Sequence, residues 1–487
     1  MDPLTRARAL FMQALAAQEQ GDLPAAESLL REALRWAPTR ASLRVNLASV
    51  LIARGRIVEA RATCAALLAD DSTLAEAWLN LSICDLRDDA PDAALAAITH
   101  ALACAPASDA VHANHGNILM LLGRHDEALA AFDRALALSP SDPNWHVSRG
   151  TALRMLERLD EAAAAQQAAL RIAPGLGDAH WNLALVELAR GHFDAGWRGF
   201  EWRWRTSDPL PVFYTGPAPR WQGEALAGRR LLLWAEQGLG DTLQFFRFAQ
   251  RLAGRGERVL VQVQPPLVRL LRGQTPGLEI VGRDEVLPAH DLHLPLLSLP
   301  GVLGAAAADV GPPACIAPVA AGVARWHGGG AARPRIGLMW QGNLENRAGR
   351  GRSVPAALMA PLLALPAGFV FIGKAADAAD LALLGASGDF TDRSREIADF
   401  ADTAAQMAAL DLVVTIDTSV AHLAASMALP CWVLLAKGAD WRWGAPGATQ
   451  SPWYPQARLF RQQAAGDWAG VLARVHAALA AWLSART

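Results

Sequence analysis

The stretch AEAWLNL, residues 75–81, opens a unit of 34 residues that recurs along the first part of the chain. Its asparagine returns with the same spacing, and the series is Asn46, Asn80, Asn114 and Asn182, with Ser148 at the skipped step. Trp78 and Leu81 are three residues apart, which predicts a helix that turns this face to a core. Asn80 falls between them, on the side that lines the concave surface when helix pairs stack. The stretch therefore predicts a repeated helix–turn–helix unit.

Three other kinds of residue keep the same period. The prolines of the series are Pro38, Pro106, Pro140 and Pro174, with Ser72 at the missing step. The turn positions are Gly21, Gly55, Asp89, Gly123, Glu157 and Gly191. The small residues are Ala26, Ala60, Ala94, Ala128, Ala162 and Gly196. This 34-residue period is typical of tetratricopeptide repeats, which bury their apolar faces against their neighbours. We place repeats near 7–40, 41–74, 75–108, 109–142 and 143–176, with a partial sixth unit from 177, and expect an α-solenoid over 1–206.

The composition bounds the class of protein. The chain has 487 residues, 52% of them hydrophobic and 19% charged, which predicts two to three globular domains without a disordered composition. The formal net charge of −2 gives no electrostatic reason to expect nucleic acid or an anionic membrane as partner.

The cysteines and the apolar runs bear on location. The five cysteines are odd in number and include no CxxC pair, which argues against a disulfide framework or a zinc site and for a reducing compartment. The first residues lack the basic-then-apolar order of a signal peptide. The longest apolar run, 410–436, is interrupted by Asp411, Asp417 and His422, so no integral membrane segment is expected. We therefore expect a cytoplasmic protein.

The repeats end in an aromatic segment, 193–197 followed by 200–205, that contains Phe193, Trp197, Phe200, Trp202 and Trp204. We interpret it as a surface that docks the solenoid onto the next domain, in preference to a ligand site. A proline-rich linker at 207–228 follows. From residue 229, short apolar runs alternate with helical stretches, and the runs are 231–235, 258–263, 278–281, 336–340, 369–372, 412–416 and 431–435. Continuous apolar strands with helical crossovers indicate parallel sheets buried on both faces. We predict two Rossmann-like lobes, 229–325 and 333–487, with a cleft between them.

Two motifs follow predicted strands. The first, EQGLGDT at 236–242, joins a strand to a helix through two glycines that leave room for a substrate. Its Asp241 would face the cleft, or would simply cap the helix. The second, TIDTSVAH at 415–422, also runs from a strand into a helix, whose N-terminus suits a diphosphate. His422 lies one turn beyond Thr418, so both can face one ligand, although a helix cap and a structural histidine would explain them as well.

Taken together and in this order, the motifs resemble the heptosyltransferase-like branch of the GT-B glycosyltransferases, glycosyltransferase family 9. The resemblance runs from about Trp234 to the C-terminus, and it is closest to the version fused behind tetratricopeptide repeats in bacteria. Its landmarks are 238–245, 293–300, 399–404, 440–443 and 451–455. The resemblance implies a GT-B fold and an inverting transfer without a metal or other cofactor. It also implies that Asp241 is the general base and that the segment with Asp417, Thr418, Ser419 and His422 binds a nucleotide-sugar donor.

One segment departs from the family pattern. Relatives commonly carry Gly-Asn-Pro, then a His and an Asp, before Arg-Ser. This chain has Gly342 and Asn343 and then Arg352 and Ser353, without the His and the Asp. A different sugar or a weakened activity would follow if the missing residues orient the donor. Arg352 is the favoured diphosphate contact because it aligns with the Arg-Ser of the family, and the other candidate cations are Arg347, Arg350 and Lys374.

A repeat solenoid ahead of a GT-B enzyme resembles the architecture of the O-linked N-acetylglucosamine transferases. There, an asparagine ladder holds an extended polypeptide. An amide with two donors and one acceptor matches a peptide unit whatever its side chain. By this resemblance Asn46, Asn80, Asn114 and Asn182 bind a peptide; alternatively, they stabilise packing between helices.

The leading hypothesis is a bacterial glycosyltransferase that modifies a protein, such as flagellin or another surface protein. The alternatives are a transferase acting on a lipid or saccharide acceptor, and a repeat adaptor whose transferase lobes have lost activity.

Overall fold

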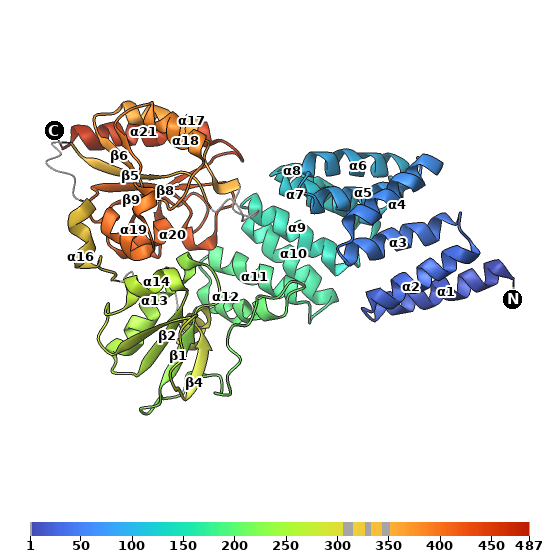
Figure 1. The fold of residues 1–487 in the computed structure, drawn as a ribbon, viewed down its shortest axis with the longest axis horizontal. Helices are drawn as coiled ribbons and strands as arrows, with labels where there is room; N and C mark the ends of the chain where they lie inside the picture. Colours follow the sequence, from blue (N-terminus) through green and yellow to red (C-terminus); the bar gives the residue numbers. More distant parts are fainter. Residues whose placement is uncertain (1, 305–314, 327–332, 343–350, 487) are drawn as a thin grey trace. The chain divides into compact units, whose positions relative to one another are not determined.

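The computed structural model describes residues 2–304, 315–326, 333–342 and 351–486. Its contacts divide the chain into two compact units (Figure 1). The first consists of Met1–Leu156 and Ala164–Pro174. The second consists of Glu157–Ala163 and Gly175–Thr487, so the last helix pair of the repeats belongs with the α/β region.

Antiparallel helix pairs form the repeats, as the period predicts. The pairs are α1 (Pro3–Glu19) and α2 (Leu23–Trp36), α3 (Ala41–Ala53) and α4 (Ile57–Asp70), α5 (Ala75–Arg87) and α6 (Pro91–Cys104), α7 (Asp109–Leu121) and α8 (His125–Leu138), α9 (Pro143–Met155) and α10 (Leu159–Ile172), and α11 (Gly177–Ala189) and α12 (Phe193–Phe200). Each pair starts within a few residues of the predicted repeat boundary. The expected tetratricopeptide solenoid is confirmed.

The periodic turn residues have a common backbone conformation. Between the helices of each pair, φ is positive at one residue: Gly21 (76°), Gly55 (74°), Asp89 (60°), Gly123 (72°), Glu157 (62°) and Gly191 (81°). Glycine adopts this left-handed conformation at no steric cost, and Asp and Glu at these positions accept a modest one. The recurrence of small residues also has a structural reason, because Ala26, Ala60 and Ala94 are completely buried between helices. At Gly196 an added Cβ would lie 2.6 Å from Leu188.

The aromatic segment after the repeats has the role predicted for it. α12 is followed by a 3-10 helix, η1 (Glu201–Trp204). The ring of Trp197 lies 6.0 Å from Phe245, 5.5 Å from Trp441 and 6.2 Å from Trp453, all in edge-on contacts. Edge-to-face rings contribute beyond their buried area. The last helix pair therefore shares a core with the α/β region of its unit.

A four-stranded parallel sheet is described in the first lobe. Its strands are β1 (Leu231–Trp234), β2 (Val259–Val263), β3 (Leu278–Gly282) and β4 (Leu292–Pro295), in the order β3-β2-β1-β4. The helices α13 (Leu239–Gly254) and α14 (Pro265–Leu271) connect β1 to β2 and β2 to β3. η2 (Leu296–Ser298) and α15 (Leu299–Val302) follow β4.

The second lobe contains the larger sheet. Within the described residues its order is β10-β11-β9-β8-β5-β6-β7, parallel except at β10. The strands are β5 (Arg335–Met339), β6 (Gly368–Phe371), β7 (Phe390–Thr391), β8 (Leu412–Ile416), β9 (Cys431–Leu435), β10 (Gln450–Ser451) and β11 (Tyr454–Arg461). The longer helices around it are α18 (Ala378–Gly385), α19 (Phe400–Met407), α20 (Ser419–Ser426) and α21 (Trp468–Ser484), with the short α16 (Ala320–Val323) and α17 (Ala356–Met359).

This sheet is buried on both faces, as continuous apolar strands require. Figure 1 shows α17, α18 and α21 over one face and α19 and α20 over the other. Val413 belongs to the core on the α20 side, whereas the next residue, Val414, belongs to the core on the α21 side. The predicted α/β class with two sheets is confirmed. The sequence pattern does not predict β4, β7, β10 or β11, because β7 and β10 are very short and β4 and β11 contain prolines.

The two lobes meet through helices. α13 of the first lobe packs against α20 of the second. The buried Arg247 guanidinium donates to the carbonyl of Trp453 over 3.0 Å. Arg269 of α14 donates to both carboxylate oxygens of Asp399, which caps α19. These contacts set the distance between the two predicted motifs.

In the described parts of the chain, no helix combines the length and the apolar character that crossing a membrane requires.

Candidate functional site

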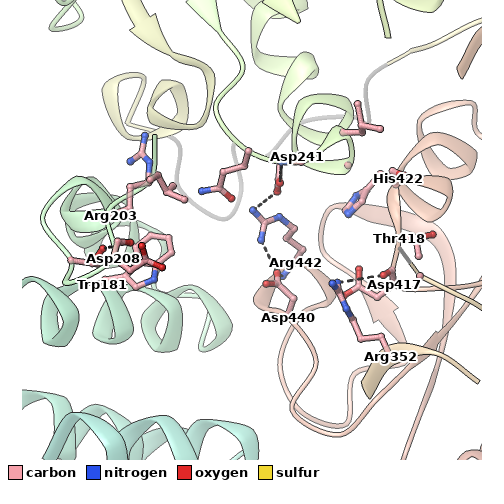
Figure 2. A pocket seen from close by; sticks show the side chains of 18 residues that line it. Trp181, Arg203, Asp208, Asp241, Arg352, Asp417, Thr418, His422, Asp440 and Arg442 are labelled. Carbon is pink, nitrogen blue, oxygen red and sulfur yellow. Dashed lines mark hydrogen bonds and ion pairs between the residues drawn. The ribbon is translucent and has the colours of Figure 1, made fainter. Parts of the chain in front are cut away.

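A pocket of about 750 Å³ lies in the second unit, where the two sequence motifs converge. The residues that line it come from three regions (Figure 2). The last helix pair and its exit supply Trp181, Arg203, Thr206, Asp208 and Leu210; the first lobe supplies Gln237, Gly238, Leu239, Gly240 and Asp241; the second lobe supplies Gly342, Arg352, Asp417, Thr418, Ser419, His422, Asp440 and Arg442. The lobe residues follow the carboxyl ends of β1, β5, β8 and β9, where open parallel sheets bind their ligands.

The glycines of the first motif allow close packing. Gly238 precedes α13, and an added Cβ on Gly240 would lie 2.7 Å from His422 and 3.4 Å from Ser419. Only a residue without a side chain lets the N-terminal turn of α13 approach α20 this closely. Asp241, at the third position of α13, accepts a hydrogen bond from the backbone N–H of Gly238 over 2.9 Å. Asp241 therefore caps α13, and this hydrogen bond orients its carboxylate towards the pocket.

Asp241 is also part of a chain of charges. Its second oxygen lies 2.6 Å from Nη2 of Arg442, and Nη1 of the same guanidinium lies 2.9 Å from Asp440 (Figure 2). Burial opposes the charge of Arg442, but Asp440 and Asp241 raise its pKa above the ordinary value. Arg442 thus connects a carboxylate of the first lobe with one of the second, and it is cationic at every physiological pH.

The second motif forms the opposite part of the pocket. Thr418 is the N-cap of α20, and Ser419 begins the helix. The first N–H groups of a helix have no partner within it and attract anions. Thr418 and Ser419 both line the pocket beside these groups.

His422 has a structural environment as well as a place in the pocket. Its Nδ1 lies 3.0 Å from the hydroxyl of Tyr454, and its ring stacks on Trp443 at 5.1 Å. Burial, reinforced by the charge of Arg442, lowers its pKa from 6.5 to about 3. His422 is therefore neutral at physiological pH and cannot supply a positive charge to a phosphate.

Asp417 and Arg352 form a second pair of charges. Nη1 of Arg352 lies 3.4 Å from the carboxylate and from the backbone carbonyl of Asp417. Burial, and then the charge of Asp440, raises the pKa of the Asp417 carboxyl, while Arg352 opposes the shift. The Arg352 side chain remains 40% exposed, so one face of its guanidinium is accessible from the pocket.

The repeat exit contributes a buried ion pair. Nη2 of Arg203 donates to both oxygens of Glu236 over 3.0 Å and to the hydroxyl of Ser298 over 2.7 Å. Burial raises the pKa of Glu236 to about 7, although Arg203 acts against this shift. Since Glu236 begins the motif that carries Asp241, Arg203 links the last repeat to the conformation of that turn.

The pocket contains the predicted catalytic residue and most of the donor-binding residues predicted from the sequence. Asp241, Gly342, Arg352, Asp417, Thr418, Ser419 and His422 all line it. Ser353 lies behind the lining, where its hydroxyl accepts the N–H of Gly342 over 3.1 Å. Lys374 does not line the pocket; it is exposed and donates to the carbonyl of Ala398 over 3.3 Å. Its predicted phosphate contact is therefore not supported. Asn343, Arg347 and Arg350 lie outside the described residues.

The four periodic asparagines have unequal environments. Asn80 is 6% exposed, donates to the carbonyl of Val45 in the preceding repeat and accepts the hydroxyl of Ser49. Its amide fits the alternative of packing between helices. Asn46, Asn114 and Asn182 instead donate to the carbonyl four residues earlier on their own helix. Peptide binding by these three stays a prediction.

Trp181, Arg203, Asp208, Asp440 and Arg442 line the pocket but are not predicted as site residues by the sequence pattern. The segment 440–443 was a landmark of the family resemblance, so its charged residues were a usable signal. Trp181 and Arg203 carried no such signal, because only the fold brings the end of the repeats to the pocket. Among the described residues, no group of three or more His, Cys, Asp or Glu side chains could hold a metal ion.

Comparison with known proteins identifies the repeats. Residues 17–82 and 114–177 match family models of the tetratricopeptide repeat. Two of the similar solved structures are a thermophilic tetratricopeptide-repeat protein of Thermus thermophilus and PilF of Pseudomonas aeruginosa. The first is 24% identical with a TM-score of 0.35, over 37% of this chain and 99% of that protein. The second is 17% identical with a TM-score of 0.37, over 42% of this chain and 93% of that protein.

A longer relative extends the similarity beyond the length of the repeats. Protein FlbA of Caulobacter vibrioides is 28% identical over 338 residues, which is 61% of this chain and 54% of FlbA. The chain thus spans about half the length of this relative. The N-terminal part of this chain consists of tetratricopeptide repeats, and such repeats favour a peptide or a protein as the partner.

Proposed function

We propose that the chain is an inverting glycosyltransferase that moves a sugar from a nucleotide-sugar donor to a hydroxyl group on a protein. The observation that carries the proposal is the convergence of Asp241, Arg442, Arg352 and the N-terminus of α20 on one pocket. These residues supply, in one place, a base, two cations and a set of unpaired N–H groups. The volume of about 750 Å³ is in the range of small-molecule sites.

The donor diphosphate would bind on the α20 side. The backbone N–H groups at Thr418 and Ser419 and the helix dipole favour a phosphate there, and Arg352 adds a charge with an accessible face. His422 would line the diphosphate side of the pocket as a neutral ring, without a charge contact to the phosphate. The reaction needs no metal in this proposal, because the arginines and the helix N-terminus offset the charge of the departing diphosphate.

The transfer step would use Asp241 as general base. The acceptor oxygen attacks the anomeric carbon from the face opposite the nucleotide, the bond to the diphosphate breaks with its electron pair, and the hydroxyl proton moves to Asp241. One contact of Asp241 has to yield for this transfer, since Gly238 and Arg442 occupy its oxygens. An arriving diphosphate would compete for the Arg442 guanidinium and so free the carboxylate when the donor is bound.

Two other functions are specific alternatives. A lipid or saccharide acceptor would use the same donor chemistry. A repeat adaptor with inactive lobes is favoured by the missing His and Asp before Arg352 and by the engaged state of both Asp241 oxygens. Donor turnover separates the adaptor from the enzymes, and the acceptor separates the enzymes from each other.

The test is nucleotide binding by the full chain. Thermal-shift measurements with a panel of nucleoside diphosphates and nucleotide sugars should show selective stabilisation by one nucleotide. Arg352→Ala should weaken this stabilisation, whereas Arg395→Ala, which removes an exposed arginine of the same lobe, should leave it unchanged. Arg352 is a better probe than His422, whose ring is part of the buried packing. If no compound stabilises the chain, the adaptor alternative replaces the proposal.

A further inference from the structure

One wall of the pocket is made by the end of the repeats. Trp181 on α11, Arg203 on η1, and Thr206, Asp208 and Leu210 in the segment after it all line the cavity. Figure 2 shows Trp181, Arg203 and Asp208 on one side, and Thr418, His422 and Arg352 on the other, with Asp241 and Arg442 between them. We name the first group the repeat wall. It belongs to the same compact unit as the two lobes.

We infer that the repeat wall is the acceptor subsite and that it takes a polypeptide segment presenting a Ser or Thr hydroxyl in neutral or basic surroundings. The inference rests on the proposed function, because it assigns the second substrate of the same pocket.

The position of the base restricts where the acceptor can bind. A general base has to reach the acceptor hydroxyl while that oxygen faces the anomeric carbon of the donor. With the diphosphate at the N-terminus of α20, the reacting carbon lies towards Asp241. The hydroxyl then has to approach Asp241 from the side away from α20. That side is the repeat wall.

The charge of the repeat wall selects among possible acceptors. Arg203 is the only cation of the repeat wall among the described lining residues, and it is buried with Glu236 and near Glu201, 3.0 Å from each. Asp208 is exposed at the pocket. A wall with a neutralised arginine and an open carboxylate repels the phosphate of a lipid-linked acceptor and attracts lysine or arginine. An acidic peptide is disfavoured for the same reason.

The repeat wall is also held rigidly by its packing. Trp181 packs on Phe200 with ring centroids 4.8 Å apart, and an added Cβ on Gly177, at the start of the same helix, would lie 1.8 Å from the carbonyl of Arg205. The backbone at Arg205 therefore packs directly against the start of α11. A fixed aromatic surface beside a fixed backbone costs little entropy when a side chain binds to it. Because this surface is part of a repeat, a scaffold that supports a protein partner, we assign it to polypeptide.

Binding of labelled peptide pools to the full chain tests the inference. One pool holds short peptides with a single Ser or Thr among Ala, Gly and Lys; the matched pool has Asp and Glu in place of Lys. We expect fluorescence anisotropy to show binding of the first pool and about tenfold weaker binding of the second. Trp181→Ala and Asp208→Asn should each weaken the binding of the first pool by about tenfold. Asp284→Asn, at an exposed carboxylate of the first lobe that does not line the pocket, is the control.

The outcomes separate the inference from the function on which it rests. Trp181→Ala also loses the contact with Phe200, so a melting curve accompanies it, and Asp208→Asn serves as the variant that leaves the core untouched. Nucleotide binding by the wild type, with peptide binding indifferent to both substitutions, would overturn the repeat wall as subsite and keep the donor site. Equal affinity for the two pools, or competition by alkyl glycosides or alkyl phosphates in place of peptides, would also overturn it. Peptide binding that depends on Trp181 without any nucleotide binding would overturn the transferase and keep the peptide site.

Discussion

At the residue scale, the candidate site depends on a few side chains with two tasks each. Asp241 caps α13 and faces the pocket, and Arg442 connects it to Asp440 over distances of 2.6 and 2.9 Å. While both of its oxygens are engaged, the carboxylate cannot take up the acceptor proton, so one contact has to yield first. The contact between Asp241 and Arg442 therefore couples the proposed donor site to the proposed base.

Substitution of Asp241 tests its role as base. Asp241→Asn keeps an acceptor for the N–H of Gly238 but cannot take a proton, so transfer should fall by about 10²- to 10⁴-fold. Nucleotide binding should be retained or strengthened, because the asparagine no longer competes with the diphosphate for the Arg442 guanidinium. Turnover of the nucleotide found by thermal shift provides the measurement. Transfer at the wild-type rate would exclude Asp241 as the base.

His422 predicts a pH dependence of stability. Its pKa is about 3 in the folded chain against an ordinary value of 6.5, so the unfolded state binds more protons between these two values. The contribution of His422 to stability is therefore complete above pH 6.5 and is lost as the pH falls towards 3. His422→Gln should unfold more easily than the wild type at neutral pH, by about 1–3 kcal/mol for the lost hydrogen bond.

The comparison with the variant isolates the histidine. Urea unfolding at several pH values from about 7 to about 4 should show that the gap between the wild type and His422→Gln narrows as the pH falls. Glu236, with its pKa raised to about 7, contributes in the opposite direction, because its protonated form is favoured in the folded chain. It is present in both proteins, so it cancels in the difference. A gap that stays constant with pH would contradict the burial of a neutral His422.

Gly240 predicts a steric effect. In Gly240→Ala the new methyl group would lie 2.7 Å from the His422 ring, which is held by a hydrogen bond to Tyr454 and by stacking on Trp443. Overpacking of this kind costs about 1–3 kcal/mol. We expect a lower melting temperature and weaker nucleotide binding, since α13 and α20 must separate. Gly254→Ala, at the other end of α13 with no atom near the added methyl, is the control.

At the scale of the elements, the repeats show that one periodic residue can have two uses. Asn80 bonds to Val45 and Ser49 on α3, whereas the Asn114 amide donates to Ala110 within α7. The same residue type at the same position of the repeat therefore stabilises one junction through its side chain and bonds along its own helix at the other. Sequence period alone does not distinguish them.

This difference predicts unequal effects of alanine. Asn80→Ala removes two hydrogen bonds between α3 and α5, so unfolding should be easier by about 1–3 kcal/mol. Asn114→Ala should change stability by about 0.5 kcal/mol or less. Chemical denaturation of the two variants gives the comparison. Equal losses would show that the packing role of Asn80 is not specific.

At the scale of the whole molecule, the boundary that matters lies inside the repeats. The contacts of Trp197 with Phe245, Trp441 and Trp453, and of Arg203 with Glu236, tie the last helix pair to both lobes of its unit. The predicted linker at 207–228 is thus not the place where the second unit begins.

Truncation tests this boundary. A chain of residues 175–487 keeps these contacts and should melt cooperatively with the nucleotide stabilisation of the full chain. A chain of residues 207–487 loses Arg203 and leaves Glu236 buried without its partner, which costs about 3–5 kcal/mol, besides exposing the aromatic core. It should aggregate or bind hydrophobic dyes. Equal stability of the two truncated chains would contradict the assignment of the last helix pair to the second unit.

The sequence by itself determined the local structure. The 34-residue period placed the turns and the buried small residues, because φ and side-chain volume are constrained residue by residue. Apolar runs similarly located the longer strands, and the two motifs located Asp241 in the helix start after a strand and Asp417 directly after a strand. Only the tertiary structure decided which residues meet. Arg442 reaches Asp241 across two lobes, Asn80 reaches the preceding helix, and Trp181 and Arg203 enter the pocket from the repeats. Such contacts depend on the packing of distant elements, which no spacing along the chain records.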